Sequence, residues 1–185
     1  VGMVAHILHA AGIKAGALST AAFVVDGIWE WNATQKTSPS PFTVQRFLRR
    51  LVREGCTHAV LEYSSHGLVQ GRTLFTWPAV AAITNTSPEH LDYHGTMEQY
   101  RADKGKLFWM LKGRGTKVLN AEDETGTLFA TIPSDKTVKY TTQNEELRDC
   151  DLALSQKTAA LQLRIPGIFN VANALCAIGC SWAVG

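Results

Sequence analysis

The sequence predicts an α/β domain built on a mainly parallel sheet flanked by helices. Short apolar segments alternate with segments of helical periodicity, which is the pattern of parallel-sheet proteins. The centre of residues 77–85 (WPAVAAITN) is apolar without alternation, as expected for a strand covered on both faces. A chain of 185 residues is long enough for one domain with a substantial core.

The elements can be placed in order from periodicity and from turn residues. Helical periodicity predicts helices over residues 2–11, 43–53, 97–111 and 170–184. Apolar runs predict strands over residues 15–22, 58–63, 77–85, 116–120 and 136–140. Residues 152–164 alternate as an antiparallel or edge pair would, and residues 90–95 resemble a polar turn.

Composition and charge exclude several classes of protein. The formal net charge is +2 and no run of Lys or Arg exceeds two residues, so we expect no nucleic-acid partner. No apolar stretch is long enough for a membrane span, and the first residues lack the features of a signal peptide. We therefore expect a cytoplasmic protein.

The cysteines Cys56, Cys150, Cys176 and Cys180 form no CxxC pair, so we interpret them as reduced core thiols. A metal pair at Cys176 and Cys180 is an alternative, but it needs two further ligands from elsewhere.

Three polar clusters follow predicted strands, where ligands collect in open α/β sheets. In the first cluster, residues 62–72, Glu62 ends a strand and hydroxyl side chains follow, a combination that suits Mg²⁺ and anions. The alternative is a polar loop with a surface carboxylate. The third cluster, residues 100–106, contains Lys104, which is ordinarily a solvated charge and matters only if it points toward the other two.

The second cluster, residues 84–95, combines two histidines, carboxylates, hydroxyls and an amide. His90 and His94 have the four-residue spacing of helical zinc sites. However, the order is Glu-His rather than His-Glu, and Gly95 is a poor helix residue. A zinc hydrolase therefore remains an alternative, and it predicts bound zinc.

Several strings resemble the central domain of the Mur ligases in order and spacing. They are LEYSSHGLVQGR (61–72), TNTSPEHLDYHG (84–95), MEQYRADKGKLF (97–108), NAED (120–123) and PGIFNVANALCAI (166–178). The resemblance covers essentially the whole chain and is strongest to the UDP-N-acetylmuramoyl-tripeptide synthetase branch. Folylpolyglutamate synthases share the fold and chemistry and remain an alternative, although the SSHGL and EHLDYHG strings favour the cell-wall branch.

The resemblance implies an ATP-dependent amide ligase of peptidoglycan precursor synthesis. Such an enzyme adds the third amino acid to UDP-N-acetylmuramoyl-dipeptide through an acyl phosphate, with Mg²⁺ and ATP bound. By similarity, Glu62 and His90 are Mg²⁺ ligands, and Lys104 is the lysine that becomes carbamylated and joins the metal site. We expect these three catalytic side chains to face a common pocket.

The resemblance also implies substrate and nucleotide contacts. The residues expected to contact the UDP-sugar-peptide substrate are Thr37, Ser38, Ser64, Gln70 and Arg72. Asn170 and Asn173 match an adenine-binding pair, although Asn170 could instead cap the last helix. For His66 and His94 we expect structural hydrogen bonds.

The chain shows no counterpart of three parts of the family. The glycine-rich GKT loop that precedes the first helix does not occur, and neither does an N-terminal UDP-binding or a C-terminal amino-acid-binding domain. An alternative function is therefore a catalytically inactive Mur-ligase-like module that binds a nucleotide sugar or a partner. The amino acid that is added cannot be inferred from these residues.

We predict that the 185-residue polypeptide alone does not turn over ATP, because nothing in it replaces the triphosphate-binding loop. The measurement is ADP release with the muramoyl substrate and an amino acid present. Substrate-dependent ADP release from this polypeptide would contradict the prediction.

Overall fold

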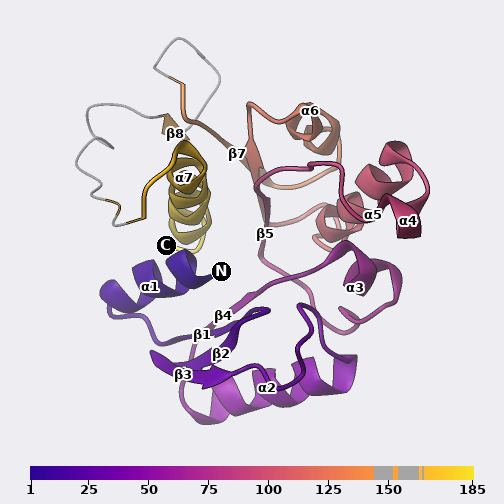
Figure 1. Ribbon diagram of the computed structural model, residues 1–185. Helices are drawn as coiled ribbons and strands as arrows, with labels where there is room; N and C mark the ends of the chain where they lie inside the picture. The colour runs from indigo at the N-terminus through magenta and orange to yellow at the C-terminus, as the bar shows by residue number, and fades with distance from the viewer. Residues whose placement is uncertain (144–151, 154–162, 164) are drawn as a thin grey trace. The chain divides into compact units, whose positions relative to one another are not determined.

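The computed structural model describes residues 1–143, 152–153, 163 and 165–185. The chain forms two compact units, Val1–Thr76 and Trp77–Gly185, and each is described by itself. Within the described residues, each unit contains a four-stranded sheet (Figure 1). The predicted α/β fold with parallel strands and flanking helices is confirmed.

The sheet of the first unit has the strand order β3-β2-β1-β4. Strands β1 (Ala15–Leu18) and β4 (His58–Leu61) pair in parallel. Strands β2 (Ala22–Val25) and β3 (Ile28–Trp31) continue the sheet antiparallel. The β2–β3 turn is Asp26-Gly27, and both residues have positive φ, as a two-residue hairpin turn of the I′ type requires.

Helix α2 (Pro41–Arg53) connects β2–β3 to β4 and covers one face of this sheet. The Ser40 hydroxyl caps it by accepting from the Thr43 amide, and Pro41 occupies its first turn, where no amide donor is needed. Its apolar face packs against the sheet, and the buried residues of this core are Leu18, Val25, Val44, Phe47, Leu51 and Cys56. Helix α1 (Gly2–Ala10) lies on the other side of the sheet (Figure 1).

The second unit has the strand order β5-β6-β7-β8, with every described pair parallel. The strands are β5 (Val80–Ile83), β6 (Thr116–Asn120), β7 (Lys136–Thr141) and β8 (Leu152–Ala153). Helices α5 (Met97–Trp109) and α6 (Glu124–Ala130) lie on one side of this sheet, and α7 (Ile168–Trp182) lies on the other (Figure 1).

Side chains on both faces of this sheet are buried, which explains why β5 (VAAI) is apolar without alternation. The adjacent residues Val118 and Leu119 are 0% and 1% exposed and belong to opposite cores. Val118 packs with Val138 and Leu175 on the α7 side, whereas Leu119 packs with Phe108 and Phe129 on the α5–α6 side.

Several elements differ from the predicted ones. The predicted strand over 15–22 is β1 followed by a turn and the start of β2, and the predicted turn over 90–95 contains a short helix, α4 (Leu91–His94). Strand β2 beyond Ala22, strand β3 and helices α3 (Ser65–Val69) and α6 were not predicted. Most of the predicted pair over 152–164 lies outside the described residues, and β8 pairs in parallel with β7.

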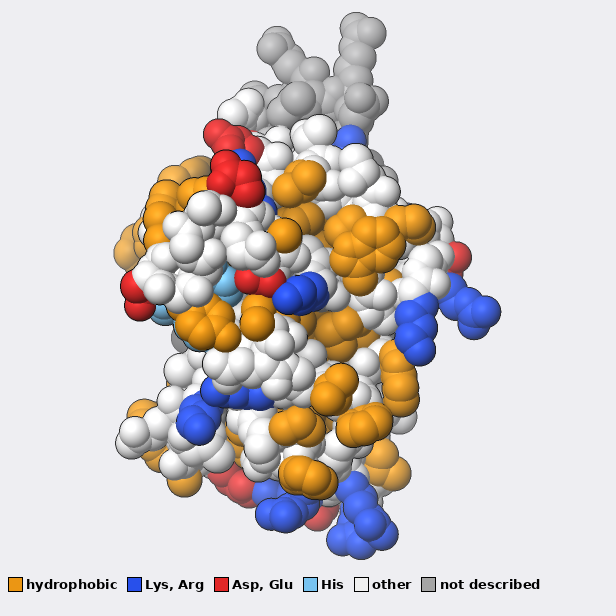
Figure 2. Space-filling model, turned by 90° about the vertical axis from the view of Figure 1, so that its right-hand side faces the viewer, with side chains coloured by type: hydrophobic (Ala, Val, Ile, Leu, Met, Phe, Trp, Pro, Cys, Tyr) orange, Lys and Arg blue, Asp and Glu red, His pale blue; other side chains and the backbone are white. Residues whose placement is uncertain are grey.

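Charged side chains do not gather in one place on the face shown in Figure 2. Lys and Arg side chains stand there in separate groups, with uncharged side chains between them. Among the described residues, no helix combines the length and the apolar character needed to span a bilayer.

Lys117 on β6 is a buried cation, only 1% exposed. Its ammonium group donates to the carbonyl oxygens of Phe129 and Ala130, each at 2.9 Å, and to that of Ile132. These carbonyls lie at the end of α6, where the last turn of a helix lacks internal donors. Burial lowers the pKa of Lys117.

We predict that Lys117→Met lowers the free energy of unfolding by about 2–4 kcal/mol, because it removes the hydrogen bonds from the ammonium group to the carbonyl oxygens of Phe129, Ala130 and Ile132. Urea denaturation of the variant and of the parent protein measures the difference. The exposed Lys36→Met is the control, expected within about 0.5 kcal/mol of the parent. Equal effects of the two substitutions would show that the buried ammonium does not hold the end of α6.

Candidate active site

In the first unit, the parallel pairing of β1 with β4 brings their carboxyl ends together. Leu18 lies opposite Leu61, and the Glu62 amide donates to the Leu18 carbonyl at 2.9 Å. The Glu62 carboxylate accepts from the Thr20 amide at 2.9 Å, and the Thr20 hydroxyl lies 3.3 Å from each carboxylate oxygen. The Thr37 hydroxyl is 2.8 Å from that of Thr20. One carboxylate and two hydroxyls therefore meet at this edge.

The neighbouring Ser38 links this edge to α3. Its hydroxyl accepts from the Ser64 amide at 2.9 Å, and the Ser64 hydroxyl in turn caps α3 by accepting from the Gly67 amide at 3.0 Å. The Arg72 guanidinium donates to the Ser38 carbonyl at 3.1 Å and to the Gln70 side chain. We call these connected residues the Glu62 cluster: Thr20, Thr37, Ser38, Glu62, Ser64, Gln70 and Arg72.

The approach of α3 to Ser38 depends on Gly67. A Cβ atom at position 67 would lie 2.4 Å from the Ser38 Cβ and 2.5 Å from its hydroxyl oxygen. Such contacts are far inside van der Waals distance, so only glycine permits this packing. The glycine of the SSHGL string is therefore explained by close packing against the Ser38 loop.

The donor atoms around Glu62 suit Mg²⁺. The Glu62 carboxylate and the hydroxyls of Thr20 and Thr37 are all oxygen donors, which hard cations prefer. Among the residues that the structure describes, no group of three or more His, Cys, Asp or Glu side chains could hold a metal ion. A site with a single carboxylate is compatible with Mg²⁺, because this ion usually keeps several waters and binds substrate phosphates.

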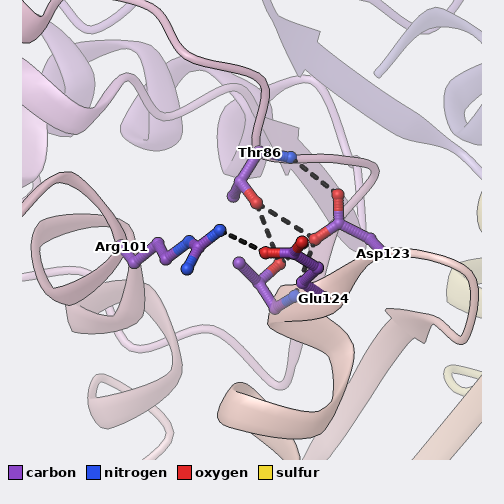
Figure 3. A network of polar contacts seen from close by, with 5 residues as sticks. Thr86, Arg101, Asp123 and Glu124 are labelled. Carbon is purple, nitrogen blue, oxygen red and sulfur yellow. Dashed lines mark hydrogen bonds and ion pairs between the residues drawn. The ribbon is translucent and has the colours of Figure 1, made fainter. Parts of the chain in front are cut away.

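In the second unit, the carboxyl ends of the strands hold the loop that follows β5. The Thr84 carbonyl accepts from the Asn120 side chain at 3.0 Å and from the Tyr140 hydroxyl at 3.4 Å. Asp123 accepts from the Thr86 amide and from the Thr86 hydroxyl, both at 3.0 Å (Figure 3). The loop is thus fixed at two points to the ends of β6 and β7.

Asp123 also begins α6 by accepting from the Thr125 amide. Burial raises the pKa of Asp123, but the hydrogen bonds from Thr125 and Thr86 outweigh it, and the net pKa is below its ordinary value. Beside it, Arg101 of α5 points toward Glu124 and forms an ion pair with it (Figure 3).

His90 and Lys104 belong to two neighbouring segments of this unit, the start of α4 and helix α5. His90 is exposed, has left-handed backbone angles (φ 58°, ψ 30°) and immediately precedes α4. Lys104 of α5 is half-buried, with its ammonium 4.9 Å from the ring centre of Tyr100. In the same two segments, the His94 Nδ1 atom and an Asp103 carboxylate oxygen are 2.8 Å apart, with both side chains buried.

Comparisons with known proteins decide the family. The family model of the Mur ligase middle domain matches residues 1–181. The chain belongs to the Mur ligase family. It is 36% identical over 196 residues to the UDP-N-acetylmuramoyl-L-alanyl-D-glutamate--2,6-diaminopimelate ligase of Synechococcus elongatus, covering 99% of this chain and 39% of that protein. It is 32% identical over 205 residues to the UDP-N-acetylmuramyl-tripeptide synthetase of a Roseiflexus species, covering 96% of this chain and 40% of that protein.

Solved Mur ligase structures share the fold. A UDP-N-acetylmuramoyl-L-alanyl-D-glutamate--2,6-diaminopimelate ligase superposes with a TM-score of 0.82 at 24% identity, over 100% of this chain and 40% of that one. MurF from Acinetobacter baumannii gives a TM-score of 0.70 at 16% identity, over 99% of this chain and 39% of that one. This Mur ligase chain therefore spans about two fifths of the length of these relatives.

The structure places the residues predicted from the Mur ligase resemblance in two groups. The predicted substrate residues and Glu62 lie together in the Glu62 cluster of the first unit. His90 and Lys104 lie in the second unit. Because each unit is described by itself, the common pocket of Glu62, His90 and Lys104 stays a prediction, as do the roles of these residues.

One alternative from the sequence, that Asn170 caps the last helix of the Mur ligase chain, is wrong. Asn170 does not cap α7, because Gly167 occupies the cap position and Asn170 lies inside the first turn. Asn170 is buried, and its side chain donates to the Pro166 carbonyl at 2.8 Å. Asn173 is half-buried one turn further along. The predicted contact of this pair with adenine is untested.

The zinc alternative also fails on geometry. His90 has a left-handed backbone, so His90 and His94 do not form a helical four-residue pair. His94 instead hydrogen-bonds to Asp103, which confirms the structural role predicted for it.

The described cysteines Cys56, Cys176 and Cys180 are free thiols, whereas Cys150 lies outside the described residues. A hydrogen bond with Cys180 lowers the pKa of Cys176.

Three site residues were missed by the sequence analysis: Thr20, Asp103 and Asp123. Thr20 contacts Glu62 across 42 positions, so only the parallel pairing of β1 with β4 reveals it. Asp103 precedes Lys104 and resembles an ordinary charged helix residue. Asp123 could have been found, because an acidic residue directly before a helix is a common N-cap.

We predict that Gly67→Ala destabilises the protein by about 1–3 kcal/mol, because the new methyl group overlaps Ser38. Thermal or urea unfolding measures the change. Gly2→Ala is the matched control, since its Cβ would meet nothing closer than 4.0 Å, and alanine favours a helix. Unchanged stability of Gly67→Ala would contradict the packing described above.

We predict that Asp123→Ala costs about 1 kcal/mol, because the α6 cap and the anchor of Thr86 are lost together. The native pKa of Asp123 is lowered, so its contribution is present above the unfolded pKa of about 3.9 and disappears as the pH falls through the native pKa. Unfolding measured from pH 7 to pH 3 should therefore show the variant and parent converging in acid. A constant difference across this range would rule out the ionised cap.

Proposed function

We propose that this chain is the central domain of an ATP-dependent ligase of peptidoglycan precursor synthesis. The reaction adds the third amino acid to UDP-N-acetylmuramoyl-dipeptide by forming an amide bond. The names of the relatives support this, because they are tripeptide synthetases and ligases that join 2,6-diaminopimelate to a muramoyl dipeptide. The activity, the substrates and the partners of the whole protein are proposed on the same grounds.

The observation that carries the proposal is the Glu62 cluster. Polar residues from four separate segments, after β1, before α2, after β4 and after α3, form two hydrogen-bonded groups at the carboxyl ends of parallel strands. The two groups meet where Thr37 is followed by Ser38 in the chain. Ligands bind at this edge in open α/β sheets. A network of this kind, with one carboxylate and several hydroxyl and guanidinium donors, suits a substrate that carries phosphates and carboxylates.

The chemical difficulty of the reaction is charge. A substrate carboxylate must attack the γ-phosphate of ATP to give an acyl phosphate, and the amino group of the incoming amino acid then displaces phosphate to form the amide. Both partners of the first step are anions, so binding groups must neutralise charge as the transition state develops. In this proposal the Arg72 guanidinium binds an anionic group of the muramoyl substrate, and the hydroxyls of Ser38 and Ser64 orient the substrate.

The metal site follows from the same reasoning. Glu62, with the hydroxyls of Thr20 and Thr37, would hold Mg²⁺, and His90 and Lys104 in its carbamylated form would hold a second ion. Bound Mg²⁺ would supply positive charge to the phosphate oxygens. A carbamate on Lys104 replaces a cation with an anion, which removes repulsion between that side chain and a metal ion.

The proposed reaction is tested with the whole encoded protein, ATP, Mg²⁺, UDP-N-acetylmuramoyl-dipeptide and a panel of amino acids that includes 2,6-diaminopimelate. The expected result is ADP together with a muramoyl tripeptide, detected by mass spectrometry. If the dipeptide carboxylate carries ¹⁸O, one label should appear in the released phosphate, because the acyl phosphate transfers that oxygen. Absence of both ADP and tripeptide would refute the ligase proposal and favour an inactive binding module.

We predict that Glu62→Ala and His90→Ala each lower kcat by about 10²–10³-fold and change KM much less. Both residues act on charge that develops during phosphoryl transfer, and the loss of one such group has this typical effect. Steady-state kinetics with the muramoyl substrate measure the two constants. Unchanged turnover in either variant would show that its metal assignment is wrong.

We predict that Arg72→Ala mainly raises the KM for the muramoyl substrate, by about 10–100-fold, because it removes charged hydrogen bonds to the substrate. Arg72→Lys keeps the charge but loses the fork of donors, so it should fall between the parent and Arg72→Ala. The same kinetic assay applies. A fall in kcat without a change in KM would instead place Arg72 at the reacting groups.

A further inference from the structure

A buried polar chain connects α4 to α5 in the second unit. The side chains of His94 and Asp103 are 0% and 5% exposed, and the His94 Nδ1 atom lies 2.8 Å from one Asp103 carboxylate oxygen. The other oxygen accepts from the Lys106 ammonium at 2.6 Å. Asp103 therefore has hydrogen-bond partners on both oxygens, as a buried carboxylate requires. We call the His94–Asp103 hydrogen bond the α4–α5 tether.

Helix α4 depends on this tether for its position. It has four residues, far fewer than an isolated helix needs, and no side chain caps its start. Leu91, Asp92 and Tyr93 are exposed, and His94 is the buried residue of this helix. The placement of α4 on α5 is therefore set chiefly by what His94 contacts.

The α4–α5 tether lies close in the chain to both residues expected at the metal site, His90 and Lys104. His90 lies one turn before His94, and its carbonyl accepts from the His94 amide at 3.1 Å, so a shift of His94 moves His90 as well. On α5, Lys104 directly follows Asp103. The ring of Tyr100, 2% exposed, lies 5.0 Å from that of His94 and 4.9 Å from the Lys104 ammonium. His90 is thus linked to the tether through a backbone hydrogen bond, and Lys104 is linked to it through the Tyr100 ring.

We propose that Asp103 and His94 are positioning residues, which fix the distance and direction between His90, directly before α4, and Lys104 on α5. The proposal rests on the ligase function proposed above, because the spacing of His90 and Lys104 affects turnover only if both residues act in that reaction. Neither residue is assigned a contact with substrate. Their effect on turnover comes through the two side chains that they hold in place.

The test uses Asp103→Leu, Asp103→Asn and His94→Gln in the whole encoded protein. Leucine removes both hydrogen bonds, asparagine keeps one oxygen acceptor and loses the charge, and glutamine keeps a side-chain donor in place of the imidazole. The matched control is Asp92→Asn, which removes an exposed carboxylate from the same short helix. Circular dichroism and the melting temperature identify variants that fold, and the asparagine and glutamine variants serve if leucine at position 103 prevents folding.

Two readouts separate positioning from stability. The first is hydrogen–deuterium exchange in peptides that cover residues 88–97, which should become faster in the tether variants and stay unchanged in Asp92→Asn. The second is kinetic: kcat should fall about 10–100-fold in Asp103→Leu, while KM for the muramoyl substrate stays within about twofold, since misplacement by about 1 Å has effects of this size. Asp103→Asn should recover part of both losses.

The outcomes distinguish this proposal from the proposed function. Unchanged exchange over residues 88–97 in folded tether variants would overturn the proposal, because α4 would not depend on Asp103. Faster exchange with unchanged kcat would also overturn it, because the tether would then be purely structural. If the parent protein forms no tripeptide at all, the ligase function fails first, and exchange alone decides whether the tether positions α4.

Discussion

Parallel strand pairing is the constraint on which the placement of the polar residues depends. In a parallel pair, both strands finish at the same edge, so the residues that follow them become neighbours whatever their separation in sequence. The pairing of Leu18 with Leu61 places Thr20 against Glu62, and the pairing of β5 with β6 places the Thr86 loop against Asp123. Hydrogen bonds then refine positions that the backbone register has already set.

Much of the fold could be predicted from the sequence, and the exceptions have physical reasons. The helices α1, α2, α5 and α7 and the strands β5 and β6 were predicted from periodicity and apolar runs. Helix α2 is the clearest case, because its buried residues Val44, Phe47 and Leu51 recur at helical spacing. Strand β3 was missed because Trp29 and Trp31 are largely exposed, so burial gives it no pattern. Its clearest signal was the Asp26-Gly27 turn. Helix α4 was missed because its four residues, of which His94 is the buried one, are too few to show helical periodicity.

The candidate site, like the fold, could be predicted from the sequence only in part. The residues of the Glu62 cluster that lie in recognisable strings, such as Ser64 and Arg72, could be named from the sequence. Thr20 and Asp103 could not, because their importance comes from partners that are brought near by folding. The buried charges of Lys117 and Asp103 are a further example. Single-sequence reasoning treats a charged residue as solvated, whereas here each ionic group is enclosed and fully provided with partners.

Gly67 and Ser38 are in contact although they are 29 residues apart in the sequence. The residue that one position can accept therefore depends on the residue at the other position. The space available is fixed by the backbones of the Ser38 loop and α3, so one position can gain a carbon atom only where the other gives one up. Among Mur ligases that keep this packing, the identities of the two residues should therefore covary. A combinatorial library at the pair would retain Ser with Gly or Ala with Gly and reject combinations in which both residues carry a Cβ.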